Sequence, residues 1–217
     1  MLTIEIASDF VCPWCFIGTS RLKTAVTMLR EQQPGFDCKA RWRPFFLNPD
    51  TPPEGEPYLP FLEKKFGGRA QVEAIFERVR AAGRPYGIDF AFEKIPQRIN
   101  TLKVHRLSAW AQAQGEGKPG DARPLIERLF AGNFQRGENL GDTETLVRIA
   151  VECGYDGSVV ADFLDSKALE SEVRSDEAAI RQLGINMVPT FIIGGREIIV
   201  GAEDPAVLAA GMLRAIV

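Results

Sequence analysis

The chain has 217 residues, of which 45% are apolar, 25% are charged and four are cysteines. A chain of this length buries a hydrophobic core without disulfide staples, and four cysteines are too few for a small secreted fold built on disulfides. The formal net charge of −3 gives no indication of a nucleic-acid partner or of binding to an anionic membrane surface.

The first residues lack the features of a secretory signal, which has a basic start and an apolar run of about 7–15 residues. The first basic residue is Arg21, and Glu5 and Asp9 interrupt the apolar stretch. No later segment approaches the roughly 18 apolar residues of a membrane helix. The sequence therefore predicts a cytoplasmic protein with no membrane partner, in which thiols are normally kept reduced.

A strand, a helix and a second strand are predicted in the first part of the chain. Apolar and polar residues alternate over residues 2–6 and again over 36–43, which is the period of a strand. Residues between them have helical spacing, and Pro34-Gly35 ends that helix. Because a strand–helix–strand crossover joins parallel strands, these two strands are predicted to be parallel.

The middle of the chain has the pattern of an all-helical insertion. It opens with a turn-rich linker that contains four prolines between Asn48 and Pro57. Asp142 is a predicted N-cap, and residues 88–92 are the one candidate strand. Helical patterns lie near residues 69–83, 99–114, 121–131, 143–153 and 158–166.

The end of the chain returns to mixed structure. A helix that ends at Gly184 precedes two short strands, residues 188–193 and 197–200, which Gly194-Gly195 joins as a hairpin. A last helix follows, which Asp204 caps and Pro205 opens.

This order of elements is that of an α/β, thioredoxin-like fold with an all-helical insertion. Residues 1–47 and 167–217 are predicted to form a discontinuous thioredoxin-like domain, and residues 48–166 an insertion domain.

Cys12 and Cys15 flank Pro13 and Trp14 where the first strand gives way to a helix. Unpaired N–H groups and the positive end of the helix dipole favour a thiolate at such a position, and the thiolate is the nucleophile in disulfide exchange. Pro13 suits the first helical position because no hydrogen bond is lost there. We therefore predict that Cys12 attacks a substrate disulfide and that Cys15, about one turn inside the helix, resolves the mixed disulfide.

Other uses of the cysteines are less well supported. Zinc usually takes four ligands from two cysteine pairs, and Cys38, Cys153 and His105 form no second pair, so no metal site is predicted. A purely structural disulfide is disfavoured in a cytoplasmic chain. Cys38 and Cys153 each lie on an apolar face and are predicted to be buried free thiols.

Val188-Pro189 is the second element of the predicted site. A proline at the start of a strand presents no N–H group to a neighbour. If the peptide bond is cis, the carbonyl and N–H groups of Val188 would face the cysteine pair, and an extended substrate segment would pair with that backbone.

Several segments carry a family resemblance: Asp9–Gly18, Arg41–Pro49, Asn100-Thr101 with His105, Val188–Phe191 and Gly201–Pro205. They resemble the DsbA-like thioredoxin superfamily, and most closely its FrnE-like branch. Relatives in that branch include 2-hydroxychromene-2-carboxylate isomerases and kappa-class glutathione transferases. The resemblance covers essentially the whole chain. It implies a thioredoxin fold with a helical insertion, a cis proline at Pro189, and thiol–disulfide oxidoreductase activity through Cys12 and Cys15.

The resemblance also bears on glutathione. By likeness to the glutathione-using relatives, Asn48, Val188, Glu203 and Asp204 would line a glutathione site, with glutathione as redox partner and no tightly bound cofactor. From the residues alone, Asn48 starts a turn and Asp204 caps a helix.

Two positions differ from relatives that the chain resembles. Trp14 stands where periplasmic DsbA enzymes carry histidine, so we expect a less oxidising couple than theirs. Cys12 stands where the glutathione-using relatives carry serine, which favours disulfide exchange over a transferase or isomerase role.

His105 lies on an apolar helix face and has two interpretations. It is either a core residue or, if the insertion folds over the cysteine pair, a residue that lines the cleft with Asn100 and moves a proton to or from Cys15. Trp14 is predicted to be an exposed apolar contact for substrate.

The predicted function is thus thiol–disulfide exchange with protein or small-molecule thiols and disulfides. Two alternatives stay open: a glutathione-dependent transferase or isomerase acting on small aromatic compounds, and a non-enzymatic binding module. The sequence also leaves a homodimer open.

Overall fold

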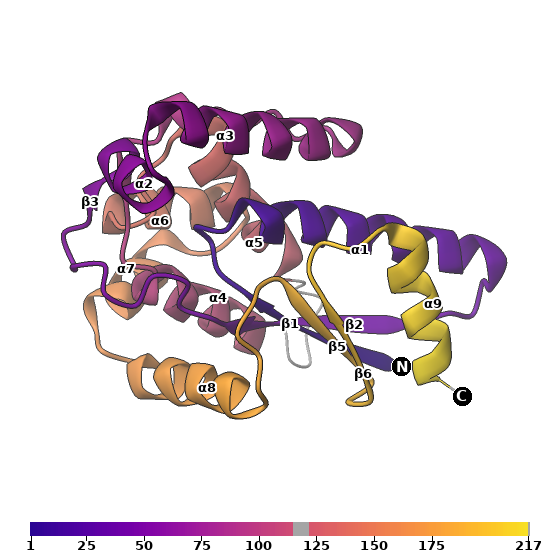
Figure 1. Ribbon diagram of the computed structural model, residues 1–217. Helices are drawn as coiled ribbons and strands as arrows, with labels where there is room; N and C mark the ends of the chain where they lie inside the picture. The colour runs from indigo at the N-terminus through magenta and orange to yellow at the C-terminus, as the bar shows by residue number, and fades with distance from the viewer. Residues whose placement is uncertain (115–121, 217) are drawn as a thin grey trace. The chain divides into compact units, whose positions relative to one another are not determined.

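The computed structural model of the protein describes residues 1–114 and 122–216 (Figure 1). The chain divides into two units, Met1–Phe45 with Arg174–Val217 and Phe46–Val173. The domain boundaries predicted from the sequence lie after residues 47 and 166. Helix α8, Glu170–Gln182, runs across the second division of the structure.

The first unit is built on a four-stranded sheet in the order β2-β1-β5-β6. The strands are β1 (Leu2–Ser8), β2 (Cys38–Pro44), β5 (Thr190–Ile193) and β6 (Glu197–Val200). Strands β1 and β2 are parallel, as predicted, and run from Leu2 opposite Cys38 to Ser8 opposite Pro44. The other two pairs are antiparallel, and β5–β6 is the predicted hairpin.

Helices pack on both faces of this sheet (Figure 1). Their bounds are Pro13–Gln32 for α1 and Pro205–Ala215 for α9. Helices α1 and α9 cover one face: Gly18 of α1 faces Phe191, and Gly211 of α9 faces Ile193. On the opposite face, Ile180 of α8 packs in one cluster with Ala7, Phe45, Ile185 and Ile192.

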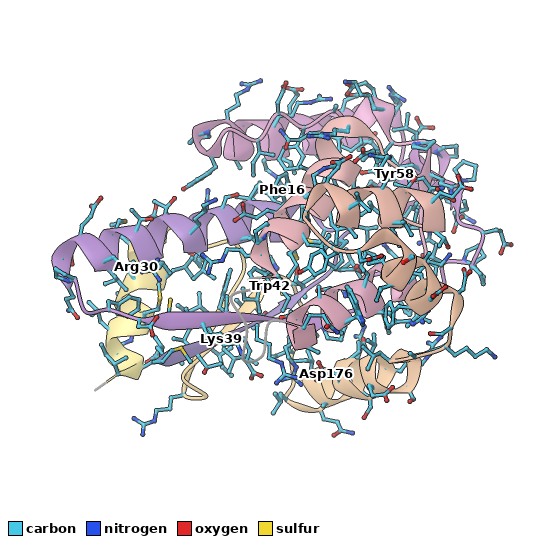
Figure 2. The ribbon with its side chains drawn as sticks, turned by 180° about the vertical axis from the view of Figure 1, so that it is seen from behind. Phe16, Arg30, Lys39, Trp42, Tyr58 and Asp176 are labelled. Carbon is cyan, nitrogen blue, oxygen red and sulfur yellow. The ribbon has the colours of Figure 1, made fainter. Side chains whose placement is uncertain are left out.

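The alternation of β2 decides which of its side chains face α1. Trp42 lies opposite Ile6 and is buried, and Figure 2 shows it on the α1 side of the sheet, with Asp176 on the other side. Arg43, the next residue of β2, points to that other side. Arg43 donates hydrogen bonds to Glu5 of β1 at 2.9 Å and to Asp176 of α8 at 2.7 Å. These charged hydrogen bonds hold α8 against the sheet.

Over its described residues, the second unit is helical as predicted, apart from one short pair of antiparallel strands, so the insertion is not all-helical. The strands are β3 (Glu56–Pro57) and β4 (Gln97–Arg98). Strands of two residues show no alternation in sequence, so the pattern could not reveal them. The helices are α2 (Tyr58–Phe66), α3 (Arg69–Gly83), α4 (Leu102–Gln114), α5 (Arg123–Ala131), α6 (Thr143–Glu152) and α7 (Gly157–Asp165), with 3-10 turns at Arg84–Tyr86 and Phe92–Lys94 and a π-helical turn at Gly132–Arg136.

Two details of this unit differ from the sequence prediction. Helix α2 was not predicted, and none of its residues is fully buried. Residues 88–92 are not a strand in the structure: Phe90 and Phe92 are buried, stack on each other, and both meet the Phe134 ring edge-on. The predicted helix start at residue 121 lies outside the described residues. Within the described ranges, no helix is both long and apolar enough to span a membrane.

Candidate active site

The cysteine pair lies at the start of α1, directly after β1. Cys12 is the N-cap residue, with φ −99° and ψ 109°, and Pro13 is the first helical residue. The N–H of Cys12 donates to Asp9 O at 3.0 Å, and the N–H of Cys15 donates to Cys12 O at 3.0 Å. The N-cap position places the Cys12 sulfur at the positive end of a 20-residue helix.

Both thiols are free and buried, with exposed fractions of 4% for Cys12 and 1% for Cys15. Burial raises the pKa of Cys15 well above its ordinary value, and a hydrogen bond to Cys12 and the charge of Cys12 raise that pKa further. The N–H of Asp9 and the hydroxyl of Ser8 lower it, because both groups donate hydrogen bonds that favour a thiolate. Burial and the neighbouring Cys12 therefore favour the protonated form of Cys15 in the reduced protein.

The Val188-Pro189 segment faces the cysteine pair. Its peptide bond is cis, as the resemblance implies, and the thiol of Cys12 donates to Val188 O at a sulfur–oxygen distance of 3.7 Å. The hydroxyl of Thr190 donates to Met187 O at 2.7 Å, and the N–H of Gly201 donates to Pro189 O at 2.7 Å. These bonds fix the backbone on both sides of Pro189.

Gly18 allows α1 to approach Pro189 closely. A Cβ atom at this position would lie 2.8 Å from Cγ of Pro189, closer than real Cβ atoms are found, and 3.2 Å from the Phe191 ring, which is a tight contact. Glycine inside a helix costs about 1 kcal/mol relative to alanine. The close packing of α1 on the cis-proline segment thus explains a glycine in the middle of this helix.

The fold agrees with the family comparison. The profile of the DSBA-like thioredoxin domain family matches residues 3–212. The protein belongs to this family. The family assignment confirms the thioredoxin-like fold class predicted from the order of elements.

Individual relatives of the DsbA-like family are similar over nearly the whole chain. A protein of Bacillus subtilis is 26% identical over 192 residues, which are 88% of this chain and 86% of the relative. The structure of a probable DsbA oxidoreductase from Streptomyces coelicolor has a TM-score of 0.88 and 28% identity, and the match covers 100% of this chain and 90% of that one.

More distant structures share the fold. The cytosolic disulfide reductase DsbM from Pseudomonas aeruginosa, solved with GSH, has a TM-score of 0.64 and 16% identity, over 99% of this chain and 98% of its own. A 2-hydroxychromene-2-carboxylate isomerase has a TM-score of 0.70 and 17% identity, over 99% and 96% of the two chains. The same DsbA-like fold thus occurs in proteins with different activities.

The loop before α9 lies beside the cis proline of this DsbA-like chain. Arg21 of α1 donates to Ala202 O at 2.5 Å, and Gly201 of the same loop binds Pro189 O. Asp204 accepts the N–H of Ala206 at 2.9 Å, which makes it the predicted N-cap of α9. Glu203 is exposed. Both candidate acidic residues therefore belong to a loop that is bonded to the cis-proline segment.

The two residues between the cysteines are partly exposed. Pro13 and Trp14 are both of intermediate exposure, so Trp14 is more covered than the exposed contact that the sequence analysis expected. The first turn of α1 holds Trp14, which limits how far its ring can extend into solvent. The part of the ring that remains exposed is available to an apolar substrate group.

Asn48, Asn100 and His105 belong to the second unit. The carbonyl of Asn48 accepts the N–H of Thr51 at 3.2 Å in a turn, and the amide of Asn100 donates to Thr51 O at 2.8 Å. Thr51 thus links the two asparagines. His105 is 5% exposed, and its ring meets the Phe46 ring edge-on at a centroid distance of 5.5 Å. The roles predicted for these three residues at the cysteine pair stay predictions.

Cys38 and Cys153 are half-buried free thiols, which corrects the expectation that both are buried. Cys38 begins β2, an edge strand that is covered by a neighbour on one side only. Cys153 is the C-cap residue of α6 and follows the buried residues of that helix in the chain. Over residues 1–114 and 122–216, no group of three or more His, Cys, Asp or Glu side chains is arranged to hold a metal ion.

Three residues of this site were given no role of their own from the sequence: Ser8, Gly18 and Thr190, of which the last two belong to the quoted motifs. Ser8 had a usable signal, because it continues the apolar row of Ile4 and Ile6 with a polar side chain; in the structure it is 4% exposed. Gly18 had a weaker one, as a glycine inside a predicted helix.

Proposed function

We propose that the protein exchanges disulfides with protein or small-molecule thiols through Cys12 and Cys15. The observation that carries this proposal is the placement of one sulfur, that of Cys12. It lies at the N-terminus of α1, is hydrogen-bonded to Cys15, and lies 3.7 Å from the carbonyl oxygen of Val188.

The exchange takes two steps. The Cys12 thiolate attacks one sulfur of a substrate disulfide, which forms a Cys12–substrate disulfide and releases the other substrate sulfur as a thiolate. Cys15 then loses its proton and attacks the Cys12 sulfur, which forms the Cys12–Cys15 disulfide and releases the second substrate thiolate. The protein gives up two electrons and the substrate gains them; the reverse sequence oxidises a dithiol substrate.

The cis-proline segment is the proposed docking edge for substrate backbone. The carbonyl of Val188 lies beside the attacking sulfur, and Pro189, buried in the structure, offers no N–H that would compete for a neighbour. The partly exposed rings of Pro13 and Trp14 supply apolar contacts on the other side of Cys12.

Trapping tests the proposed roles. In Cys15→Ser protein the mixed disulfide cannot be resolved, so Cys12–substrate adducts should accumulate in cell extracts and appear as bands that a reducing agent removes. Cys12→Ser protein should form none. Cys38→Ser and Cys153→Ser are matched controls, since both residues are cysteines outside α1, one at the start of β2 and the other at the C-cap of α6. Equal trapping by the Cys12→Ser protein would refute the assignment.

Glutathione is the proposed small-molecule partner, with Val188, Glu203 and Asp204 as its candidate contacts in the first unit. The support is that the loop of Glu203 and Asp204 is bonded to the cis-proline segment. Calorimetric titration of oxidised protein with S-methylglutathione, which cannot exchange, tests it. Glu203→Gln should weaken binding, and an unchanged affinity would remove Glu203 from the site. Turnover of small aromatic compounds that survives Cys15→Ala would support a transferase or isomerase instead.

A cytoplasmic location and a homodimer remain predictions. Cell fractionation and light scattering of the purified protein test them.

A further inference from the structure

The resolving step of the proposed exchange poses a problem for Cys15. This thiol is 1% exposed, and burial is the largest of the effects that raise its pKa. A thiol is nucleophilic only as a thiolate. Cys15 must therefore form an anion in a buried position at the moment when it attacks the Cys12–substrate disulfide.

Two hydrogen-bond donors lower the pKa of the Cys15 thiol, the hydroxyl of Ser8 and the N–H of Asp9. We call them the Cys15 donor pair. Both residues are buried, Ser8 with 4% and Asp9 with 0% of its surface exposed. Water therefore has little access to this side of the sulfur.

The strand register explains why a hydroxyl lies here. Ser8 ends β1 in the same alternating row as Ile4 and Ile6, and Ile6 is paired with Phe191, which faces Gly18 of α1. This row therefore points at α1, and its last member lies beneath the first turn, which holds Cys15. The N–H of Phe45 binds Ser8 O at 3.1 Å and fixes the end of the strand.

An apolar side chain would be the ordinary choice in this row. A serine that breaks the pattern at a buried position next to a reactive sulfur is the kind of local exception that marks functional sites.

The balance around Cys15 changes during the reaction. In the reduced protein, the hydrogen bond to Cys12 and the charge of Cys12 both raise the pKa of Cys15. In the mixed disulfide the Cys12 sulfur is neutral and covalently bound, so both effects are lost. Burial is then opposed by the donor pair alone, and the donors have their largest influence in the intermediate where the Cys15 thiolate is needed.

We propose that the Ser8 hydroxyl is a catalytic group of the resolving step, in which it and the Asp9 N–H stabilise the Cys15 thiolate as it attacks Cys12. This inference rests on the proposed disulfide exchange. It assigns no part to Ser8 in the first step, the attack by Cys12.

Dithiobis(nitrobenzoate), an aromatic disulfide, separates the two steps, since each releases one coloured nitrothiobenzoate anion. The first anion leaves when Cys12 attacks the reagent, and the second leaves when Cys15 resolves the adduct. Stopped-flow absorbance follows both phases in a Cys38→Ser/Cys153→Ser background, in which no other thiol reacts.

Ser8→Thr and Ser8→Val are a matched pair of similar shape that differ in the hydroxyl, and Ser8→Ala is a second hydroxyl-free variant if valine does not fold. We expect the hydroxyl-free variants to slow the second phase at pH 7 by about tenfold, the effect of one hydrogen bond to a charged group, and to move its pH profile to higher pH. Ser8→Thr should retain the fast phase, and the first phase should be unchanged in all variants.

Ser20→Ala is the control. Ser20 lies on α1, as Cys15 does, but its hydroxyl donates to Phe16 O at 3.2 Å. This variant should alter neither phase. A second phase in Ser8→Val or Ser8→Ala with the wild-type rate and pH profile would overturn the proposal, as would a Ser8→Thr protein as slow as Ser8→Val. Failure of the proposed function itself would look different. In the same background, protein with both Cys12 and Cys15 would release only one nitrothiobenzoate anion, or its Cys15→Ser variant would still release two.

Discussion

Cys12 and Cys15 share one turn of α1, but their sulfurs have different surroundings. Cys12 is the N-cap residue, whereas Cys15 is 1% exposed and has a pKa raised by burial and by Cys12. We expect iodoacetamide at pH 7 to alkylate Cys12 at least about ten times faster than Cys15, because alkylation follows the thiolate fraction. Mass spectrometry of peptides from timed samples gives both rates.

Cys12→Ala protein is the control for this comparison. It lacks the hydrogen bond and the charge that Cys12 contributes, so alkylation of Cys15 should become faster than in the wild type. Equal rates for the two cysteines in wild-type protein would contradict the prediction.

Thr190 gives a second test at single-residue scale. Its side chain is fully buried, and its hydroxyl donates to Met187 O at 2.7 Å. Thr190→Val keeps the shape and removes this bond, so we expect a loss of about 1 kcal/mol in the free energy of unfolding. Disulfide exchange should also slow several-fold, because the bond holds the segment that carries Val188. Urea denaturation and insulin reduction measure the two effects.

Thr27→Val is the matched control, since the hydroxyl of Thr27 binds a carbonyl of its own exposed helix turn, Lys23 O, at 3.0 Å. This variant should change exchange little. If Thr190→Val behaves like Thr27→Val, the bond to Met187 does not position the cis-proline segment.

The residues found from sequence and those missed differ in what makes them recognisable. Cys12, Cys15 and Pro189 belong to short motifs whose chemistry is local. Ser8 and Thr190 are ordinary polar residues in sequence, and the site that they support forms only when distant segments meet. Cys12 and Val188, for example, are 176 positions apart. Periodicity does not report such contacts.

Among whole elements, those with one strongly buried face were predictable. The alternation of β1 and β2 and the cap of α6 by Asp142, which accepts the N–H of Thr145 at 2.9 Å, follow directly from the residues. Helix α2 has no fully buried residue, and strands β3 and β4 have two residues each. None of these three elements was predicted from the sequence.

Helix α1 offers a prediction at the element scale. Because a Cβ at Gly18 would lie 2.8 Å from Pro189, Gly18→Ala should push α1 away from the cis-proline segment. Overpacking costs about 1–3 kcal/mol and better helix propensity returns about 1 kcal/mol, so the expected net effect is a modest destabilisation. Exchange should fall more clearly, because the shift separates Cys12 from Val188. Urea denaturation and insulin reduction again measure both.

Gly35→Ala is the control for added bulk, because nothing lies within 4 Å of a Cβ at that position. It should leave stability and exchange near the wild-type values. A Gly18→Ala protein with wild-type exchange would show that the close approach of α1 is not needed for activity.

At the scale of the whole chain, two rules recovered the first unit although its two segments are far apart in sequence. The crossover rule makes β1 and β2 parallel, and the glycine pair makes β5 and β6 a hairpin. The pairing of β1 with β5, which joins the two segments, follows from neither rule. That pairing brings Pro189, just before β5, to the end of β1 where the cysteines begin.

The redox state of that site should set how stability of the whole protein depends on pH. Burial raises the pKa of Cys15 in the folded state, whereas an unfolded cysteine titrates near pH ~8.5. The folded protein thus holds this proton more tightly than the unfolded chain. Its contribution to stability is full below about pH 8.5 and is lost as pH rises toward the folded-state pKa, by at most about 1.4 kcal/mol per pH unit.

The disulfide form has no Cys15 proton, so oxidised protein should not show this loss. Urea denaturation between pH 7.5 and 10 should therefore give free energies of unfolding that fall more steeply with pH for the reduced protein than for the oxidised protein. A Cys153→Ser background is needed, because burial also raises the pKa of Cys153 and would add the same trend to both forms. If the two forms lose stability in parallel, folding does not raise the pKa of Cys15. The resolving step would then not need hydrogen-bond donors at the Cys15 sulfur.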